Sequence, residues 1–116
     1  MSTYTVVDSL TKAVEIPKDG TLSRTIHQDH QIKVVLFGFA GGQELSQHTA
    51  SVPVTVQIVQ GEARFTVDGE EKELSAGSWI YMEANVPHAV YAKSDMVMVL
   101  TMITGNSQAD ARPGRV

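Results

Sequence analysis

Short stretches in which apolar and polar residues alternate dominate this chain. An alternation with period two is typical of a β-strand that buries one face, and Gly, Asn, Asp or Pro separates the stretches. No segment of ten or more residues carries the apolar period of a helix together with capping residues. The predicted strands, which are rich in β-branched and aromatic residues, are 31–39, 54–60, 63–67, 79–82, 89–92 and 96–103. The pattern therefore predicts an all-β fold.

A turn at Gly61 is expected to join two of these strands as a hairpin, because glycine adopts positive φ without steric cost. Pairing across this turn would place Ile58 opposite Phe65 and Val56 opposite Val67. All four side chains would then share one face with apolar neighbours, and we expect that face to form the interior of the fold.

A second turn, Asp68-Gly69, precedes the charged run Glu70-Glu71-Lys72-Glu73. Charged side chains on a strand discourage its pairing with another molecule. This run is therefore predicted to be a solvated strand at the edge of a sheet.

Composition limits both the size and the partners of the protein. The chain has 116 residues, 42% of them hydrophobic, which suits one domain with a real core. Its net charge is −4 and its basic residues are scattered, so we expect neither nucleic acid nor a membrane surface as partner. There is no cysteine to form a disulfide or a thiolate ligand, and the first ten residues do not resemble a secretory leader. We expect a soluble, cytoplasmic protein.

Two histidines occur within a regular frame of glycines in residues 42–89. His48 follows Gly42 by six residues and precedes Gly61 by thirteen, while His88 closes the segment SAGSWIYMEANVPHA. This frame resembles the two-motif signature of the cupin superfamily, whose first motif supplies His-x-His, a carboxylate four residues later and then a glycine. The second motif of the family supplies one more histidine. Here Ala50 stands in place of the second histidine and Val54 in place of the carboxylate.

The resemblance implies a double-stranded β-helix, the jelly-roll barrel of the cupins. On this basis residues 25–104 are expected to form the barrel. Residues 1–24 are expected to form an N-terminal strand or arm at a dimer interface, and residues 105–116 a loosely ordered tail.

The same resemblance makes His48 and His88 candidate ligands of one divalent metal, which would be Fe, Mn, Ni or Zn. These are two of the four usual ligands. A third would have to come from another position, and the candidates are Gln57, Gln60, Glu44 and Glu83. Of these, only Gln60 shares its strand face with Val56 and Ile58.

With Ala50 and Val54 in place of two ligands, the expected cage becomes an apolar wall beside His48. Apolar walls with a few convergent polar groups are typical of small-molecule sites. The expected pocket residues are His48, Ala50, Val54, Val56, Phe65, Met82 and His88. Two classes of function follow. We favour a small cupin that binds a small organic molecule; the alternative is a metal-dependent oxygenase or isomerase with a non-standard ligand set.

The N-terminal region also bears on oligomeric state. Its residues 3–16 include several β-forming side chains that a barrel of this length does not need for its own core. Outward-facing residues around Trp79 and Tyr91 would add to an exposed apolar patch. We therefore predict a twofold homodimer, formed by sheet packing or by exchange of the N-terminal strand.

Overall fold

A computed structural model of the chain describes residues 3–105. Its strands are β1 (Thr21–Gln28), β2 (Ile32–Phe39), β3 (Glu44–His48), β4 (Val54–Gln60), β5 (Glu62–Val67), β6 (Glu70–Ser75), β7 (Trp79–Met82), β8 (His88–Ala92) and β9 (Met96–Ile103). The one helical element in this range is a single 3-10 turn, η1 (Leu10–Lys12), so the all-β prediction is confirmed. No helix within residues 3–105 has the length and apolar character needed to cross a bilayer. The predicted loose tail lies, apart from Gly105, outside the described residues.

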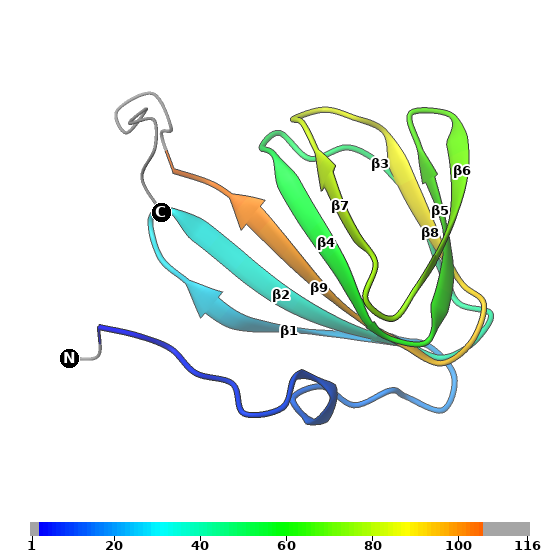
Figure 1. Cartoon of the computed structure of the whole chain (residues 1–116), viewed down its shortest axis with the longest axis horizontal. Helices are drawn as coiled ribbons and strands as arrows, with labels where there is room; N and C mark the ends of the chain where they lie inside the picture. Colours follow the sequence, from blue (N-terminus) through cyan, green and yellow to red (C-terminus); the bar gives the residue numbers. More distant parts are fainter. Residues whose placement is uncertain (1–2, 106–116) are drawn as a thin grey trace.

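The strands form two antiparallel sheets that face each other (Figure 1). The larger sheet has the order β1-β2-β9-β4-β7 and the smaller one the order β3-β8-β5-β6. From β4 onward the chain changes sheet repeatedly: β5 and β6 lie in the smaller sheet, β7 in the larger, β8 in the smaller and β9 in the larger. Facing sheets joined in this way are the jelly-roll barrel that the resemblance implied.

The predicted hairpin across Gly61 is wrong. Strand β4 pairs with β7 and β9, whereas β5 pairs with β6 and β8, so Ile58 and Phe65 are not cross-strand neighbours. The turn carries the chain from one sheet to the other. Gly61 has φ 85°, and a Cβ there would collide with the backbone oxygen of Asp95. Alternation indicates which side chains face inward, but it does not distinguish two neighbouring strands from two facing sheets.

The turn at Asp68-Gly69 does close a hairpin. Val67 pairs with Glu70, and the two residues between them have φ values of 51° and 83°. Two positive φ values in a two-residue loop match the right-handed twist of the flanking strands. The strand that follows, β6, lies at the edge of the smaller sheet and is mostly exposed, as its charged sequence predicted.

The main core fills the space between the sheets. The predicted interior residues Val54, Val56, Ile58 and Phe65 are at most 2% exposed, and Val67 is partly buried. The other fully buried large side chains of this core are Phe39, Met96 and Met98. The inward orientation of these five residues was therefore predicted correctly, although one of the strand pairings was not.

A second apolar cluster lies between the larger sheet and the N-terminal segment. Val14 packs on the outward side chains of Leu36 and Val97, both of which are fully buried. This segment runs alongside the larger sheet (Figure 1). Gly38 permits the approach, because a Cβ at this position would collide with the backbone of Glu15.

This packing gives the N-terminal arm a role within its own subunit. Its segment 10–16 covers the outer face of its own barrel, and its place at a dimer interface stays a prediction. Both faces of β2 are consequently mostly apolar, and its sequence therefore lacks a clear alternation of apolar and polar residues. Tyr4 and Val6, nearer the N-terminus, are 76% and 69% exposed.

Candidate functional site

The two predicted histidines meet at the junction of β3 and β8. His48 and His88 are register partners in these neighbouring antiparallel strands, and a register shift in β3 after Leu45 precedes their pairing. Their ring centroids lie 4.3 Å apart with an angle of 62° between the ring planes. Two side chains expected to share one metal must converge, and the structure brings these two together.

Backbone carbonyl groups fix the orientation of both rings. The Nδ1 atom of His48 lies 2.8 Å from the carbonyl oxygen of Ser46, and that of His88 lies 2.9 Å from the carbonyl oxygen of Val86. Because a carbonyl oxygen only accepts hydrogen bonds, each Nδ1 must carry the proton. In the neutral rings both Nε2 atoms therefore keep a free lone pair, which can accept a hydrogen bond or bind a metal.

His88 is 4% exposed, whereas His48 is exposed at the rim. Within residues 3–105 no fully buried side-chain nitrogen or oxygen lacks a hydrogen-bond partner. The free Nε2 atom of His88 is therefore not sealed inside the core, and it opens onto a cavity.

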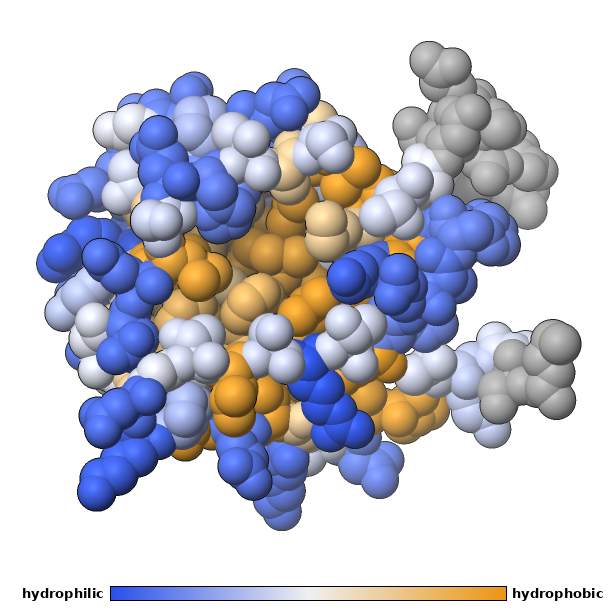
Figure 2. Space-filling view, turned by 180° about the vertical axis from the view of Figure 1, so that it is seen from behind, coloured by the Kyte–Doolittle hydropathy of each residue, from blue (hydrophilic) through white to orange (hydrophobic). Residues whose placement is uncertain are grey.

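This cavity, which we call the barrel pocket, has a volume of about 400 Å³. It lies between the larger sheet and the β3-β8 edge of the smaller one. Seen from behind, the molecule is hollowed, with an apolar floor surrounded by mostly polar side chains (Figure 2). The lining residues are Ser23, Thr25, Lys33, Val35, Phe37, His48, Thr49, Ala50, Val54, His88, Leu100 and Met102.

The walls of the barrel pocket are mainly aliphatic and aromatic, with polar groups at a few places. Among residues 3–105, three hydroxyl groups, two imidazoles and one ammonium group are its polar side chains, and no acidic side chain lines it. An apolar cavity with a few convergent polar groups has the make-up of a small-molecule site.

Of the seven expected pocket residues, the structure brings four to the barrel pocket: His48, Ala50, Val54 and His88. The other three, Val56, Phe65 and Met82, are 1%, 0% and 3% exposed and belong to the main core. All three have the predicted inward orientation. They lie, however, in the part of the barrel that side chains fill completely. The alternation of inward and outward residues does not show where the packed core ends and the cavity begins.

The residues present do not complete a metal site of the usual kind. Two imidazoles with free Nε2 atoms are suitable ligands, but such sites take three or more protein ligands. Within the described part of the chain, no group of three or more His, Cys, Asp or Glu side chains is placed to hold a metal. Ala50 and Val54, which line the barrel pocket in the two ligand positions of the motif, offer only hydrocarbon.

None of the four candidates for a third ligand reaches the barrel pocket. Gln57, Gln60 and Glu83 are exposed, and Glu44 lines a groove on the outer face of the smaller sheet. The face assignment of Gln60 is wrong because a register shift between Ile58 and Gln60 interrupts the alternation of β4.

Sequence reasoning missed several lining residues, above all Lys33. The alternation Lys33-Val35-Phe37 in β2 was a usable signal, since residues two apart share a strand face. The apolar residues on the opposite face of β2 concealed it. Ser23 and Thr25 were missed because the mixed sequence of β1 did not suggest a strand.

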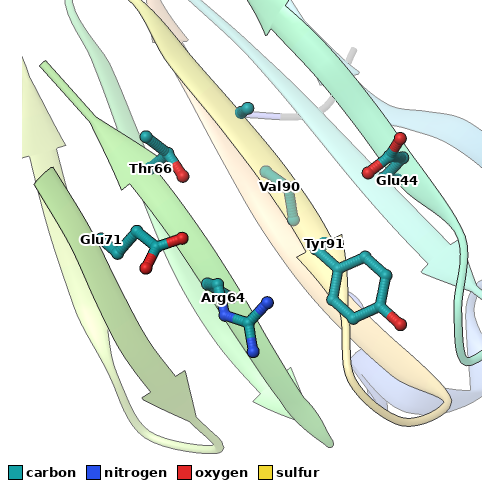
Figure 3. Close-up of a pocket in the computed structure, with 7 residues that line it drawn as sticks. Glu44, Arg64, Thr66, Glu71, Val90 and Tyr91 are labelled. Atoms are coloured by element: carbon teal, nitrogen blue, oxygen red, sulfur yellow. The ribbon is translucent and has the colours of Figure 1, made fainter. Parts of the chain in front are cut away.

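Three charged side chains, Glu44, Arg64 and Glu71, line the outer groove of the smaller sheet (Figure 3). The Arg64 guanidinium lies 5.6 Å from the ring centre of Tyr91, and its Nε donates to Glu73 at 3.1 Å. Glu73 also accepts a hydrogen bond of 2.6 Å from Lys93. The ammonium of Lys93, followed by the guanidinium, lowers the pKa of Glu73. Arg64, Glu73 and Lys93 therefore satisfy one another, and of these three residues Arg64 lines the groove.

Comparison with known proteins identifies the family to which this fold and site belong. The family model for the cupin domain matches residues 35–104. No curated protein gives a match. A crystal structure of a conserved protein of unknown function from Streptococcus pyogenes is 33% identical, with a TM-score of 0.79 over 91% of this chain and 92% of that one.

Two further solved structures are similar. A cupin superfamily protein from Desulfitobacterium hafniense is 26% identical, with a TM-score of 0.77 over 81% of this chain and 86% of its own. A cupin 2 conserved barrel domain protein from Leptotrichia buccalis is also 26% identical, with a TM-score of 0.75 over 80% of this chain and 45% of its own.

Proposed function

The chain belongs to the cupin family, and from this premise we propose that it binds a small organic molecule in the barrel pocket. The observation that carries the proposal is the pair of free Nε2 atoms of His48 and His88 beside an apolar cavity of about 400 Å³. Neither Nε2 atom forms a hydrogen bond within residues 3–105, so both are available to a ligand.

Each part of the barrel pocket has a role in this proposal. A ligand that covers apolar wall residues such as Val54 and Leu100 removes their surface from water. This burial stabilises the complex by about 25 cal/mol per Å². The two imidazoles accept hydrogen bonds from a hydroxyl or amine of the ligand. A hydrogen bond of this kind contributes about 0.5–1.5 kcal/mol net, and its main effect is to orient the ligand.

The tautomer of the histidines also supports a second candidate, a metal-dependent oxygenase or isomerase. Fe, Mn, Ni or Zn bound to the two Nε2 atoms would need its remaining ligands from water or substrate. We rank this function lower because Ala50 and Val54 supply no donor atom. The nearby ammonium of Lys33, which lines the same cavity, also disfavours a cation.

The side-chain ¹H–¹⁵N signals of the histidines provide the experiment. The purified protein is first assayed for bound metal by elemental analysis and then titrated with a panel of small organic acids, amides, alcohols and amines. A binding ligand should shift the signals of His48 and His88, while His27 and His30, which lie outside the cavity, serve as internal controls. Stoichiometric metal would support the second candidate. A panel that leaves both pocket histidines unmoved in metal-free protein would contradict the first.

A further inference from the structure

Lys33 occupies a place in the barrel where the fold itself needs only an apolar side chain. It lies on the inward face of β2 with Val35 and Phe37, and all three line the barrel pocket. Its register partners are Gln28 on β1 and Met102 on β9, and the row continues through Val54 on β4 to Met82 on β7. The positive charge therefore lies where the apolar run Met102, Val54, Met82 gives way to polar β1.

The described part of the chain provides no counter-charge for this ammonium group. Among residues 3–105 no acidic side chain lines the barrel pocket, and Lys33 takes part in no ion pair. By contrast, Lys72 and Lys93 on the outer surface each approach a glutamate. Partial exposure keeps the Lys33 ammonium hydrated while the cavity is open. A ligand that displaces this water must supply charge or hydrogen bonds in its place.

Neutral donors lie on the neighbouring strand β1. Thr25 pairs in register with Val35 and Ser23 with Phe37, so both hydroxyl groups flank the strand that carries Lys33 and line the same cavity. An ammonium group with hydroxyl donors nearby is suited to a carboxylate, whose two oxygens accept several hydrogen bonds.

We propose that the barrel pocket selects a small monocarboxylate, whose charge is bound by Lys33 and whose apolar body lies against Phe37 and Leu100. The imidazoles of His48 and His88 would then accept hydrogen bonds from the other end of the ligand. This inference rests on the proposed binding function and adds the chemical class of the ligand. A single cation in a protein of net charge −4 favours a monoanion over a phosphate or a dicarboxylate.

The experiment compares matched probes that differ only in charge. Hexanoate, hexanamide and hexylamine, together with benzoate and benzamide, are titrated near pH 7 by NMR into the wild type and three variants. Lys33→Met removes the charge and keeps an apolar chain of similar length; Lys33→Arg keeps the charge. Lys18→Met, at an exposed position outside the barrel pocket, changes the net charge by the same amount and is the control. Thermal unfolding checks that every variant is folded.

We expect each carboxylate to bind the wild type about tenfold or more tightly than its amide, and the amine to bind most weakly. This preference should disappear in Lys33→Met, persist in Lys33→Arg and remain unchanged in Lys18→Met. Equal binding of acids and amides, or a preference that survives in Lys33→Met, would overturn the assignment of Lys33 and leave the binding function intact. If no probe of any charge binds, both the ligand class and the binding function fail.

Discussion

His48 and His88 pack edge to face with their ring centroids 4.3 Å apart, although 40 positions separate them in the chain. Pairing of β3 with β8 brings them together, and one backbone carbonyl group accepts a hydrogen bond from Nδ1 of each ring, which leaves its Nε2 atom free. The backbone therefore builds the site before any ligand arrives. Preorganisation of this kind reduces the entropic cost of binding.

Removal of each imidazole should affect binding and stability differently. His88→Ala removes a buried ring and its bond to Val86, so we expect a loss of about 2–4 kcal/mol in the free energy of unfolding. His48→Ala, at the exposed rim, should cost less than about 1 kcal/mol. Both variants should lose ligand affinity. Urea denaturation with a parallel binding assay checks this, and equal stability losses would contradict the burial difference.

Chelation should leave the fold intact. The described residues offer two metal ligands in the barrel pocket, too few for a site that contributes to folding free energy. We therefore expect prolonged dialysis against EDTA to leave the melting temperature unchanged. Added Zn²⁺ should bind weakly and in competition with protons, because neutral imidazole is the ligand. Metal that survives dialysis at one equivalent would mean that the ligand set is larger than His48 and His88.

The core between the sheets should be sensitive to a loss of volume at Phe65. Its ring is 0% exposed and belongs to the main core, so Phe65→Ala should cost about 3–5 kcal/mol of unfolding free energy. Chemical denaturation measures this directly. Tyr91→Ala, at a position of the smaller sheet that is 37% exposed, is the comparison and should cost clearly less.

A chain of hydrogen bonds at the end of β1 should make stability depend on acid pH. The Thr5 hydroxyl bonds to Nδ1 of His27 at 3.0 Å, and the opposite ring nitrogen donates to Asp29 at 2.8 Å. The bond from His27, followed by the backbone N–H groups of Ile32 and Gln31, holds the pKa of Asp29 well below its ordinary value.

Because the pKa of Asp29 is depressed in the folded state, its ionised form stabilises the fold above the unfolded-state value of about 4. That contribution is lost progressively as the pH falls below about 4 and toward the folded-state pKa. Asp29→Asn should therefore be less stable than the wild type at neutral pH and should lose less stability on acidification. Asp8→Asn, which removes the same charge at an exposed position, is the control. Parallel pH profiles for wild type and Asp29→Asn would refute this role.

We further predict that the protein is a twofold homodimer. Since segment 10–16 covers its own barrel, sheet packing through β7 is the route we now favour. Trp79 and Tyr81 on this edge strand are 62% and 48% exposed. Light scattering should give twice the chain mass of 12.6 kDa. The Trp79→Glu variant should show a mass closer to that of the monomer. A monomeric wild type at micromolar concentration would disprove the prediction.

Much of the barrel could be predicted because inward-facing residues and tight turns are determined by residues close together in the sequence. Period-two alternation located the inward residues of β4 and β5, and Asp68-Gly69 located a tight turn. Sheet membership could not be derived, because inward alternation is the same whether two strands are neighbours or face each other. A register shift such as that before Gln60 likewise leaves no clear mark in the pattern.

The candidate site was predictable only as far as its motif positions. His48, Ala50, Val54 and His88 were found through the glycine frame, and all four line the barrel pocket. Lys33 was not found, since its strand is apolar on both faces and its partners on β9 are about 70 residues away in the chain. The opposite face of that strand is apolar because the N-terminal segment covers it, a long-range contact that the alternation does not reveal.

The position of β9 has a consequence for how this chain can fold. The last strand that the structure describes, β9, lies between β2 and β4 and is hydrogen-bonded to both. Until β9 has been made, β2 and β4 cannot belong to one sheet. A nascent chain that has not yet reached residue 96 can form the hairpins β1-β2 and β5-β6, but neither β2 nor β4 has its central neighbour. Strands β2 and β9, which are far apart in the sequence, must pair before the larger sheet is complete. Folding should therefore be slow, in milliseconds to seconds, and cooperative. Productive folding during synthesis therefore waits for β9 to emerge.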